Sequence, residues 1–366
     1  MNPTKCLLIK ALLAPGVTTS LSLNEWETLI RQARSAQLLS RLATLITEQG
    51  LLNRVPDKPR QHLISISRLC ERQRTAVRWE VEHLLEALDQ AQTPLVLLKG
   101  AAYEMADLPP GRCRIFGDFD LLVPKSKLDA VETALMMHGW SSAHQSPYDQ
   151  RYYRTWMHEL PPMRHISRQS VIDVHHSLVP ETAPLRPDPK KILAATVACD
   201  GHPEIRVLCG NDMILHSAVH LFHDGEFDNA LRDLFDLRDL VTHFVQDERD
   251  WSNLADRAIE LNLGRPLHYA LRYLQRMLDL SIPTHIHTRL GPHAPGPVGN
   301  ILRDAIFERG LMPSHETCSD WLSPVAMFAL YVRGHALRMP FHLLLPHLVR
   351  KALYRGNLLP ENPRGG

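Results

Sequence analysis

The sequence predicts an α+β fold in which a small mixed β-sheet is flanked by N- and C-terminal helical segments. Three observations support this prediction. Apolar residues recur with a helical period up to residue 90, short apolar runs typical of buried strands follow, and helical patterns return beyond residue 190. We therefore expect a helical region at 1–90, a sheet-bearing core at 91–180 and a second helical region at 190–366.

The N-terminal region is helical in pattern from residue 24 onwards, and its last segment is the clearest. Apolar residues recur there at intervals of three or four positions with charged residues between them, at Val77, Val81, Leu84, Leu85 and Leu88. This spacing places the apolar side chains on one face of a helix, which can then pack against the core.

The core region opens with the short apolar run TPLVLLKG at 93–100, which Gly100 ends and which suits a buried strand. A second strand is expected in RIFGDFDLLV at 114–123, and a helix follows it. The segments RYYRTWMHEL at 151–160 and SVIDVHHSLV at 170–179 are rich in β-branched and aromatic residues, so each is expected to be a strand.

The C-terminal region begins after the proline-rich stretch at 180–191, which reads as a linker or an extended excursion. Helical patterns then cover 212–223, 228–245 and much of 252–279. The small sheet is therefore expected to lie between two helical segments of the chain.

The composition is that of an ordinary globular chain, with 44% apolar and 22% charged residues. Lys and Arg number 41 against 40 Asp and Glu, so the net charge does not indicate nucleic acid as a partner. No run approaches the roughly 18 apolar residues that span a bilayer, and we expect no transmembrane segment. The six scattered cysteines and the lack of a signal-peptide pattern favour a cytoplasmic location.

Two aspartates stand within a strand that is otherwise suited to burial. Side chains alternate between the faces of a strand, so Asp118 and Asp120 point the same way and repel each other. A divalent cation between them would offset this repulsion, since Mg²⁺ prefers carboxylate oxygens. Asp173 lies in a similar apolar setting, so the three acids suggest a two-metal site. The alternative is that Asp118 and Asp120 simply face solvent on an amphipathic strand.

These motifs resemble the signature of the uncharacterised bacterial nucleotidyltransferase family, within the polymerase-β-like nucleotidyltransferase superfamily. That signature comprises an L-K-G turn, an Arg four residues before D-x-D-L-L-V, and a helix ending in Gly and an aromatic residue. The corresponding residues here are Lys99–Gly100, Arg114, Asp118–Asp120 and Gly139–Trp140. Weaker similarity continues through VIDVHHSL at 171–178 and the histidine-containing segment at 213–240, so it covers roughly residues 60 to 245.

The resemblance implies a nucleotidyltransferase core that transfers a nucleoside monophosphate from a nucleoside triphosphate, with ATP as the expected donor, and releases pyrophosphate. It implies that Asp118, Asp120 and Asp173 bind two Mg²⁺ ions, and that Asp173 can also take the proton of the acceptor hydroxyl. Lys99 and Gly100 would meet the phosphates. Arg114 would neutralise phosphate or orient the acids. The acceptor, a small molecule, a peptide or a protein, is not identified by the sequence.

Two positions depart from the superfamily pattern. Ala101 stands where a serine usually follows the glycine, so a hydroxyl ligand for the phosphates is missing. His176 stands where an aromatic residue usually follows the histidine after the third acid. Both departures leave open a second reading, in which the protein is a nucleotide-binding or regulatory module of the same fold with weak catalysis.

The histidines support a third reading, a metal-dependent hydrolase. His216, His220 and His223 are spaced to share one helix face, and a second group comprises His158, His165, His175 and His176. No adjacent glutamate of the zincin motif accompanies the helical histidines. Within the nucleotidyltransferase reading, the candidate substrate or supporting residues are His175, His216, His220 and Asp236.

Overall fold

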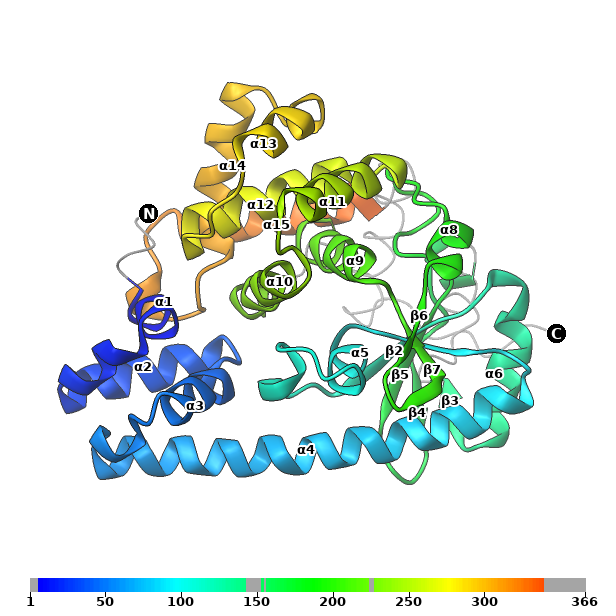
Figure 1. Cartoon of the computed structure of the whole chain (residues 1–366), viewed down its shortest axis with the longest axis horizontal. Helices are drawn as coiled ribbons and strands as arrows, with labels where there is room; N and C mark the ends of the chain where they lie inside the picture. Colours follow the sequence, from blue (N-terminus) through cyan, green and yellow to red (C-terminus); the bar gives the residue numbers. More distant parts are fainter. Residues whose placement is uncertain (1–5, 143–152, 155, 224–226, 339–366) are drawn as a thin grey trace, which may run out of the picture.

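The computed structural model describes residues 6–142, 153–154, 156–223 and 227–338. A mixed seven-stranded sheet lies on one side of the molecule and is surrounded by helices (Figure 1). Helices account for most of the described residues, so the structure confirms the predicted α+β class with helical segments before and after the sheet.

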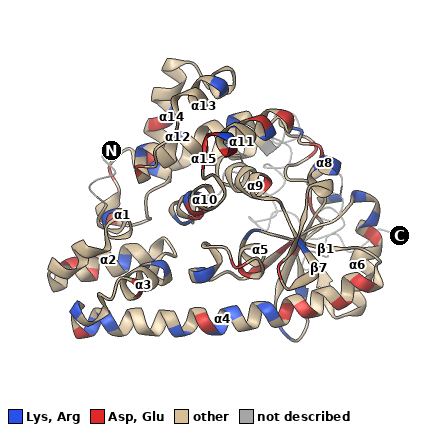
Figure 2. Cartoon of the chain, in the orientation of Figure 1, with Lys and Arg blue, Asp and Glu red and all other residues tan. Residues whose placement is uncertain are grey.

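The N-terminal helices form a separate layer that is tied to the sheet by one long helix. They are α1 (Leu7–Leu13), α2 (Leu23–Ser35), α3 (Leu39–Glu48) and α4 (Asp57–Gln90). Helix α4 is 34 residues long and runs along one edge of the whole molecule (Figure 1). Basic and acidic residues are interspersed along it (Figure 2). Its predicted apolar positions Val77, Val81, Leu84 and Leu88 are buried, as expected for the face that packs on the core.

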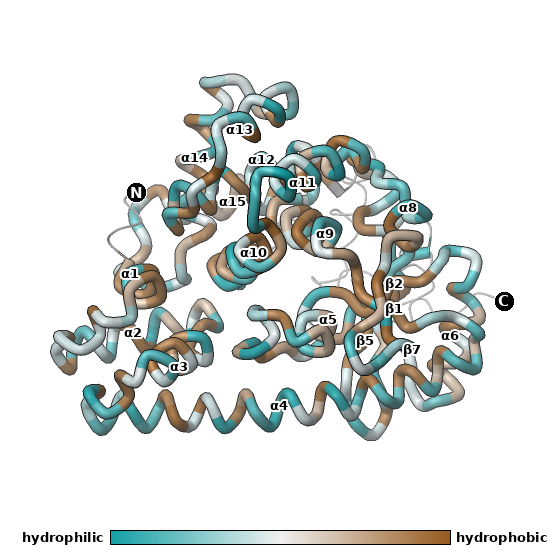
Figure 3. Tube along the Cα trace, viewed as in Figure 1, coloured by the Kyte–Doolittle hydropathy of each residue, from teal (hydrophilic) through white to brown (hydrophobic). Residues whose placement is uncertain are grey.

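The sheet has the strand order β3-β4-β5-β2-β1-β7-β6. Its strands are β1 (Leu95–Leu98), β2 (Asp118–Leu122), β3 (Trp140–Ser142), β4 (Met163–His165), β5 (Val171–His175), β6 (Val197–Cys199) and β7 (His202–Val207). Strand β2 pairs in parallel with β5 and antiparallel with β1. Strand β1 is apolar along its length (Figure 3), whereas Asp118 and Asp120 interrupt the apolar residues of β2 and Asp173 interrupts those of β5.

Strands β6 and β7 correct the expectation that residues 190–366 are helical throughout. Strand β7 pairs in parallel with β1, and β6 pairs antiparallel with β7. The two strands are joined by a tight turn in which Gly201 has a φ of +77°, a conformation that glycine adopts without steric cost. The sheet therefore extends beyond residue 180, and the division into three domains stays a prediction.

The expected strand at 151–160 is absent among the described residues of that segment. Residues 153, 154 and 156 are helical, Glu159 makes a single bridge to His175, and residues 151, 152 and 155 lie outside the described part. The remaining helices of the core are α5 (Lys99–Met105), α6 (Leu128–Met137) and α8 (Pro189–Ala194).

The C-terminal helices pack against one another, and α9 is the one that lies beside the sheet (Figure 1). They are α9 (Gly210–Phe222), α10 (Ala230–Phe244), α11 (Glu248–Glu260), α12 (Gly264–Leu278), α13 (Thr284–Leu290), α14 (Pro297–Gly310) and α15 (Ser323–Arg338). Aromatic rings of Phe222, Tyr273 and Phe307 pack together where three of these helices meet. In the described part of the chain, no helix combines the length and the apolar character that crossing a membrane requires.

Candidate active site

The three predicted acids lie on one face of two neighbouring strands. Asp118 and Asp120 are two positions apart on β2, and Asp120 is paired in register with Asp173 on β5. Asp118 is exposed at the start of its strand, whereas Asp120 is only 4% exposed. Neighbouring strands are about 4.8 Å apart, so the Asp120 and Asp173 carboxylates share a confined space.

Lys99 and His175 hold the Asp120 carboxylate. The Lys99 ammonium donates to Asp120 Oδ1 at 2.8 Å, and His175 Nε2 lies 2.9 Å from the same oxygen. Burial alone would raise the pKa of Asp120, but the charges and hydrogen bonds of these partners hold it well below its usual range. Burial would likewise lower the pKa of His175, yet its hydrogen bond to Asp120 and the charge of Glu159 raise it. Asp120 is therefore ionised, and the pKa of His175 is raised by its contacts with Asp120 and Glu159.

Lys99 reaches Asp120 because of an unusual turn between β1 and α5. Leu98 is paired with Asp120 across the sheet, and Lys99 follows it with a φ of +48°. A left-handed conformation is uncommon for a residue with a Cβ atom, and such residues concentrate at functional sites. Gly100 is buried here, and a Cβ atom on it would lie 2.9 Å from the Phe116 ring. Close packing against Phe116 thus accounts for the glycine.

Of the three acids, Asp173 is the one with a buried oxygen that accepts no hydrogen bond. Its Oδ1 atom is buried and has no hydrogen-bond partner. Burial, reinforced by the negative charges of Asp120 and Glu159, raises the pKa of Asp173 to about 7. A buried carboxylate oxygen without a donor is costly unless something else binds it. The orphaned oxygen opposite Asp120 is therefore the feature that fits a divalent cation.

The carboxylate oxygens of Asp118, Asp120 and Asp173 are not all within 4.8 Å of one another, as the ligand atoms of a single ion would be. Among the described residues, the three-ligand group whose donor atoms lie within 4.8 Å of one another is instead His158, Glu159 and His175. Repulsion between carboxylates and the attachment of Asp120 to Lys99 are consistent with this wider spacing. Glu159 was not singled out from the sequence, although its position directly after His158 is a signal that could have found it.

Arg114, in the loop before β2, takes part in a buried network of ion pairs. Its guanidinium is bound to Asp236 and lies 3.8 Å from Asp233, both on α10. Arg41 on α3 binds the other oxygen of Asp236 at 2.9 Å and also binds Asp239 at 2.6 Å. The side chain of Arg114 is only 9% exposed, and its guanidinium is already paired with Asp236 and Asp233. Of the two roles expected for Arg114, this favours orienting the strand over binding a phosphate.

The histidines of α9 do not join the acids as ligands. His216 is buried and lines a small pocket with Lys99 and Tyr103. Burial, with the nearby charge of Lys99, lowers the pKa of His216 to about 3, so this imidazole is neutral. His220 Nε2 lies 4.0 Å from Asp233. In the second histidine group, His165 contacts the His138 carbonyl, away from the acids.

Comparison with known families agrees with this arrangement. The model of the uncharacterised nucleotidyltransferase family matches residues 22–279, well over half of the chain. Comparison with curated proteins and with solved structures gave no significant match. The matched region begins in the N-terminal helices, contains all seven strands and ends after α12. This chain therefore belongs to the uncharacterised nucleotidyltransferase family, a family of transferases.

Proposed function

We propose that this protein transfers a nucleoside monophosphate from a nucleoside triphosphate, with ATP as the expected donor, to a hydroxyl of an acceptor, and releases pyrophosphate. The observation that carries the proposal is the buried, partnerless oxygen of Asp173 in register with Asp120. Family membership supplies the reaction class, and this oxygen indicates where on the sheet the reaction would take place.

Asp118, Asp120 and Asp173 are the residues that would hold two Mg²⁺ ions. All three are hard oxygen ligands on one sheet face, and Asp118 is exposed at the edge where a triphosphate can approach. When bound, the ions would neutralise the phosphate charge and stabilise the charge that develops during transfer. Glu159 and His175 border the same face and define its inner wall.

Lys99 would bind the phosphates of the donor nucleotide. In the structure its ammonium neutralises Asp120, with 19% of the side chain exposed. When another cation neutralises Asp120, the ammonium becomes available to a phosphate oxygen without leaving the turn. Ala101 is buried in the first turn of α5 and offers no hydroxyl, so Lys99 carries the donor contact at this turn.

Asp173 would accept the proton of the acceptor hydroxyl. A general base works best when its pKa lies near the working pH, and in the metal-free protein the pKa of Asp173 is raised to about 7. Because Oδ1 is assigned to the cation, the second carboxylate oxygen, Oδ2, is the atom that would take the proton.

A nucleotide-binding module with little turnover is the competing function. It is favoured by Ala101, and by the engagement of Asp120 with Lys99 and His175. Both functions require binding of a triphosphate with Mg²⁺. They differ in whether the nucleoside monophosphate is transferred to an acceptor.

The test is transfer of label from triphosphates labelled at the α-phosphate, with Mg²⁺ and cell lysate as the source of acceptor. Wild type is compared with Asp118→Asn and with Asp129→Asn, which removes the same charge from an exposed position on α6. We expect transfer with wild type and Asp129→Asn and none with Asp118→Asn. Binding without transfer would support the module, and failure to bind any triphosphate would contradict both functions.

A further inference from the structure

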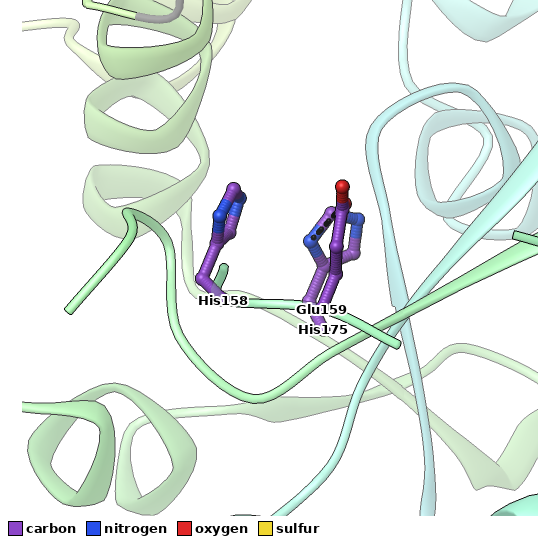
Figure 4. Close-up of side chains that lie close together, drawn as sticks. All are labelled: His158, Glu159 and His175. Carbon is purple, nitrogen blue, oxygen red and sulfur yellow. Dashed lines mark ion pairs between the residues drawn. The ribbon is translucent and has the colours of Figure 1, made fainter. Parts of the chain in front are cut away.

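A group of three potential metal ligands lies beside the acids but uses different residues. His158, Glu159 and His175 each offer a ligand atom, and these atoms all lie within 4.8 Å of one another. Figure 4 shows the three side chains rising on the same side of their backbone segments. His158 and His175 are buried, and the Glu159 side chain is 18% exposed, so the group is enclosed but reachable from solvent.

The backbone that carries these side chains is held in place by hydrogen bonds without any bound ion. Glu159 forms an antiparallel bridge with His175, the end residue of β5. The Leu160 amide donates to the Val174 carbonyl at 2.9 Å, and the His176 amide donates to the His158 carbonyl at 2.8 Å. Segment 158–160 is therefore held against the end of β5 by one isolated bridge and these two hydrogen bonds. A ligand set on such paired backbone is preorganised, which lowers the ordering cost of binding an ion.

His175 already has the outer contact that metal-bound histidines need. Its Nε2 lies 2.9 Å from Asp120 Oδ1, while its Nδ1 faces Glu159. Metal-bound histidines almost always direct their second nitrogen to a carboxylate, carbonyl or water, which fixes the ring and its tautomer. Here Asp120 would fill that position, leaving His175 Nδ1 as the ligand atom.

The spacing and chemistry of the group suit a transition metal ion. His175 Nδ1 and Glu159 Oε2 are 3.3 Å apart. Ligands at the Zn²⁺ distances of 2.0–2.1 Å in a tetrahedron are about 3.3 Å from each other, so the observed separation is that of one tetrahedral edge. Two imidazoles and a carboxylate are ligands typical of Zn²⁺ and its neighbours, whereas Mg²⁺ prefers oxygen alone.

We propose that His158, Glu159 and His175 form a binding site for a transition metal ion of the Zn²⁺ class, distinct from the site of the three aspartates. Three protein ligands leave one tetrahedral position for water or substrate. The bound ion would lock segment 158–160 onto β5 and hold His175 in place against Asp120. This site does not depend on the proposed transfer reaction, since none of its three ligands is an aspartate of the triad.

The experiment is titration of the metal-free full-length protein with Zn²⁺ by calorimetry, in excess Mg²⁺, and with Co²⁺ by visible absorption. The variants are His158→Ala and Glu159→Gln. The matched control is His83→Ala on α4, where the histidine and Glu86 have the same 3.3 Å separation and no third ligand among the described residues. Circular dichroism and thermal unfolding without metal would show that each variant is folded.

We expect wild type and His83→Ala to bind one Zn²⁺ with equal affinity, and each site variant to lose about tenfold or more in affinity. Co²⁺ should give the intense visible bands of a tetrahedral complex in wild type and lose them in the variants. Absence of stoichiometric binding, or equal binding by the folded variants, would overturn the proposal. Asp118→Asn separates the two sites, because it should lose binding of Mg²⁺ and triphosphate while Zn²⁺ binding persists.

Discussion

The carboxylates of α10 and those on the shared face of β2 and β5 are both close to buried arginines, lysines or histidines, yet their charges are balanced differently. On α10, Asp236 binds Arg41 through one oxygen and Arg114 through the other, and Asp239 binds Arg41 again. On the sheet, Asp120 has Lys99 and His175, but Asp173 Oδ1 has no partner.

This difference separates a structural role from a chemical one. A buried ion pair whose oxygens are all bound holds elements together, and losing one partner is costly. The α10 network joins α3, the loop before β2 and α10, which lie far apart in sequence. A carboxylate left without a donor instead raises the energy of the folded protein until a ligand binds. We therefore propose that the sheet face receives cations and that the network on α10 holds that face in place.

The largest expected effect comes from Asp120→Asn, which should damage both chemistry and stability. It removes a proposed cation ligand and leaves Lys99 and His175 without their shared anion. We expect transfer to fall by about 10³-fold and the free energy of unfolding to fall by about 3 kcal/mol. Label transfer and urea unfolding measure the two losses. Full activity in a folded variant would contradict the assigned role.

Asp236→Asn should separate the two regions. It removes the anion shared by Arg41 and Arg114, so we expect the free energy of unfolding to fall by about 3–5 kcal/mol. Affinity for triphosphate with Mg²⁺ should stay within about threefold of wild type under folding conditions, because the sheet acids are untouched. Loss of affinity without loss of stability would show that Asp236 acts in the site itself.

Asp173→Asn should stabilise the metal-free protein. The pKa of Asp173 is about 7 in the folded state and 3.8 as the ordinary value. The folded state then binds more protons between these pH values, and this group makes stability fall as pH rises through that window. At pH 8 with chelator, we expect the variant to be more stable by about 1–3 kcal/mol. The free energies of unfolding are measured with urea in the presence of chelator. Equal values for wild type and Asp173→Asn would mean that the Asp173 carboxylate does not destabilise the metal-free protein.

The smallest expected effect is on the pH dependence of stability through His216. Its pKa is lowered to about 3 from an ordinary 6.5, so the unfolded state binds more protons between these values. This group contributes stability that is complete above pH 6.5 and lost as pH falls towards 3. The stability gap between wild type and His216→Asn should therefore narrow by about 2 kcal/mol between pH 7.5 and 5. A constant gap would mean that His216 is not held neutral.

Local patterns predicted the parts of the site that depend on one strand at a time. Alternation along a strand placed Asp118 and Asp120 on one face, and the structure agrees. The partners of those residues come from distant segments that no period reveals, such as Arg114 with Asp236, which are 122 positions apart. Strands β6 and β7 were missed for a similar reason, because β7 depends on pairing with the distant β1, and β6 depends on pairing with β7.

The most direct test is calorimetric titration of wild type with a non-hydrolysable ATP analogue, in Mg²⁺ and then in chelator. Because we propose that the sheet acids bind the cations that accompany a triphosphate, we expect clear binding with Mg²⁺ and loss of that binding without it. Binding of equal strength in both conditions, or no binding in either, would contradict the claim that the face of β2 and β5 with the three aspartates is a metal-dependent nucleotide site.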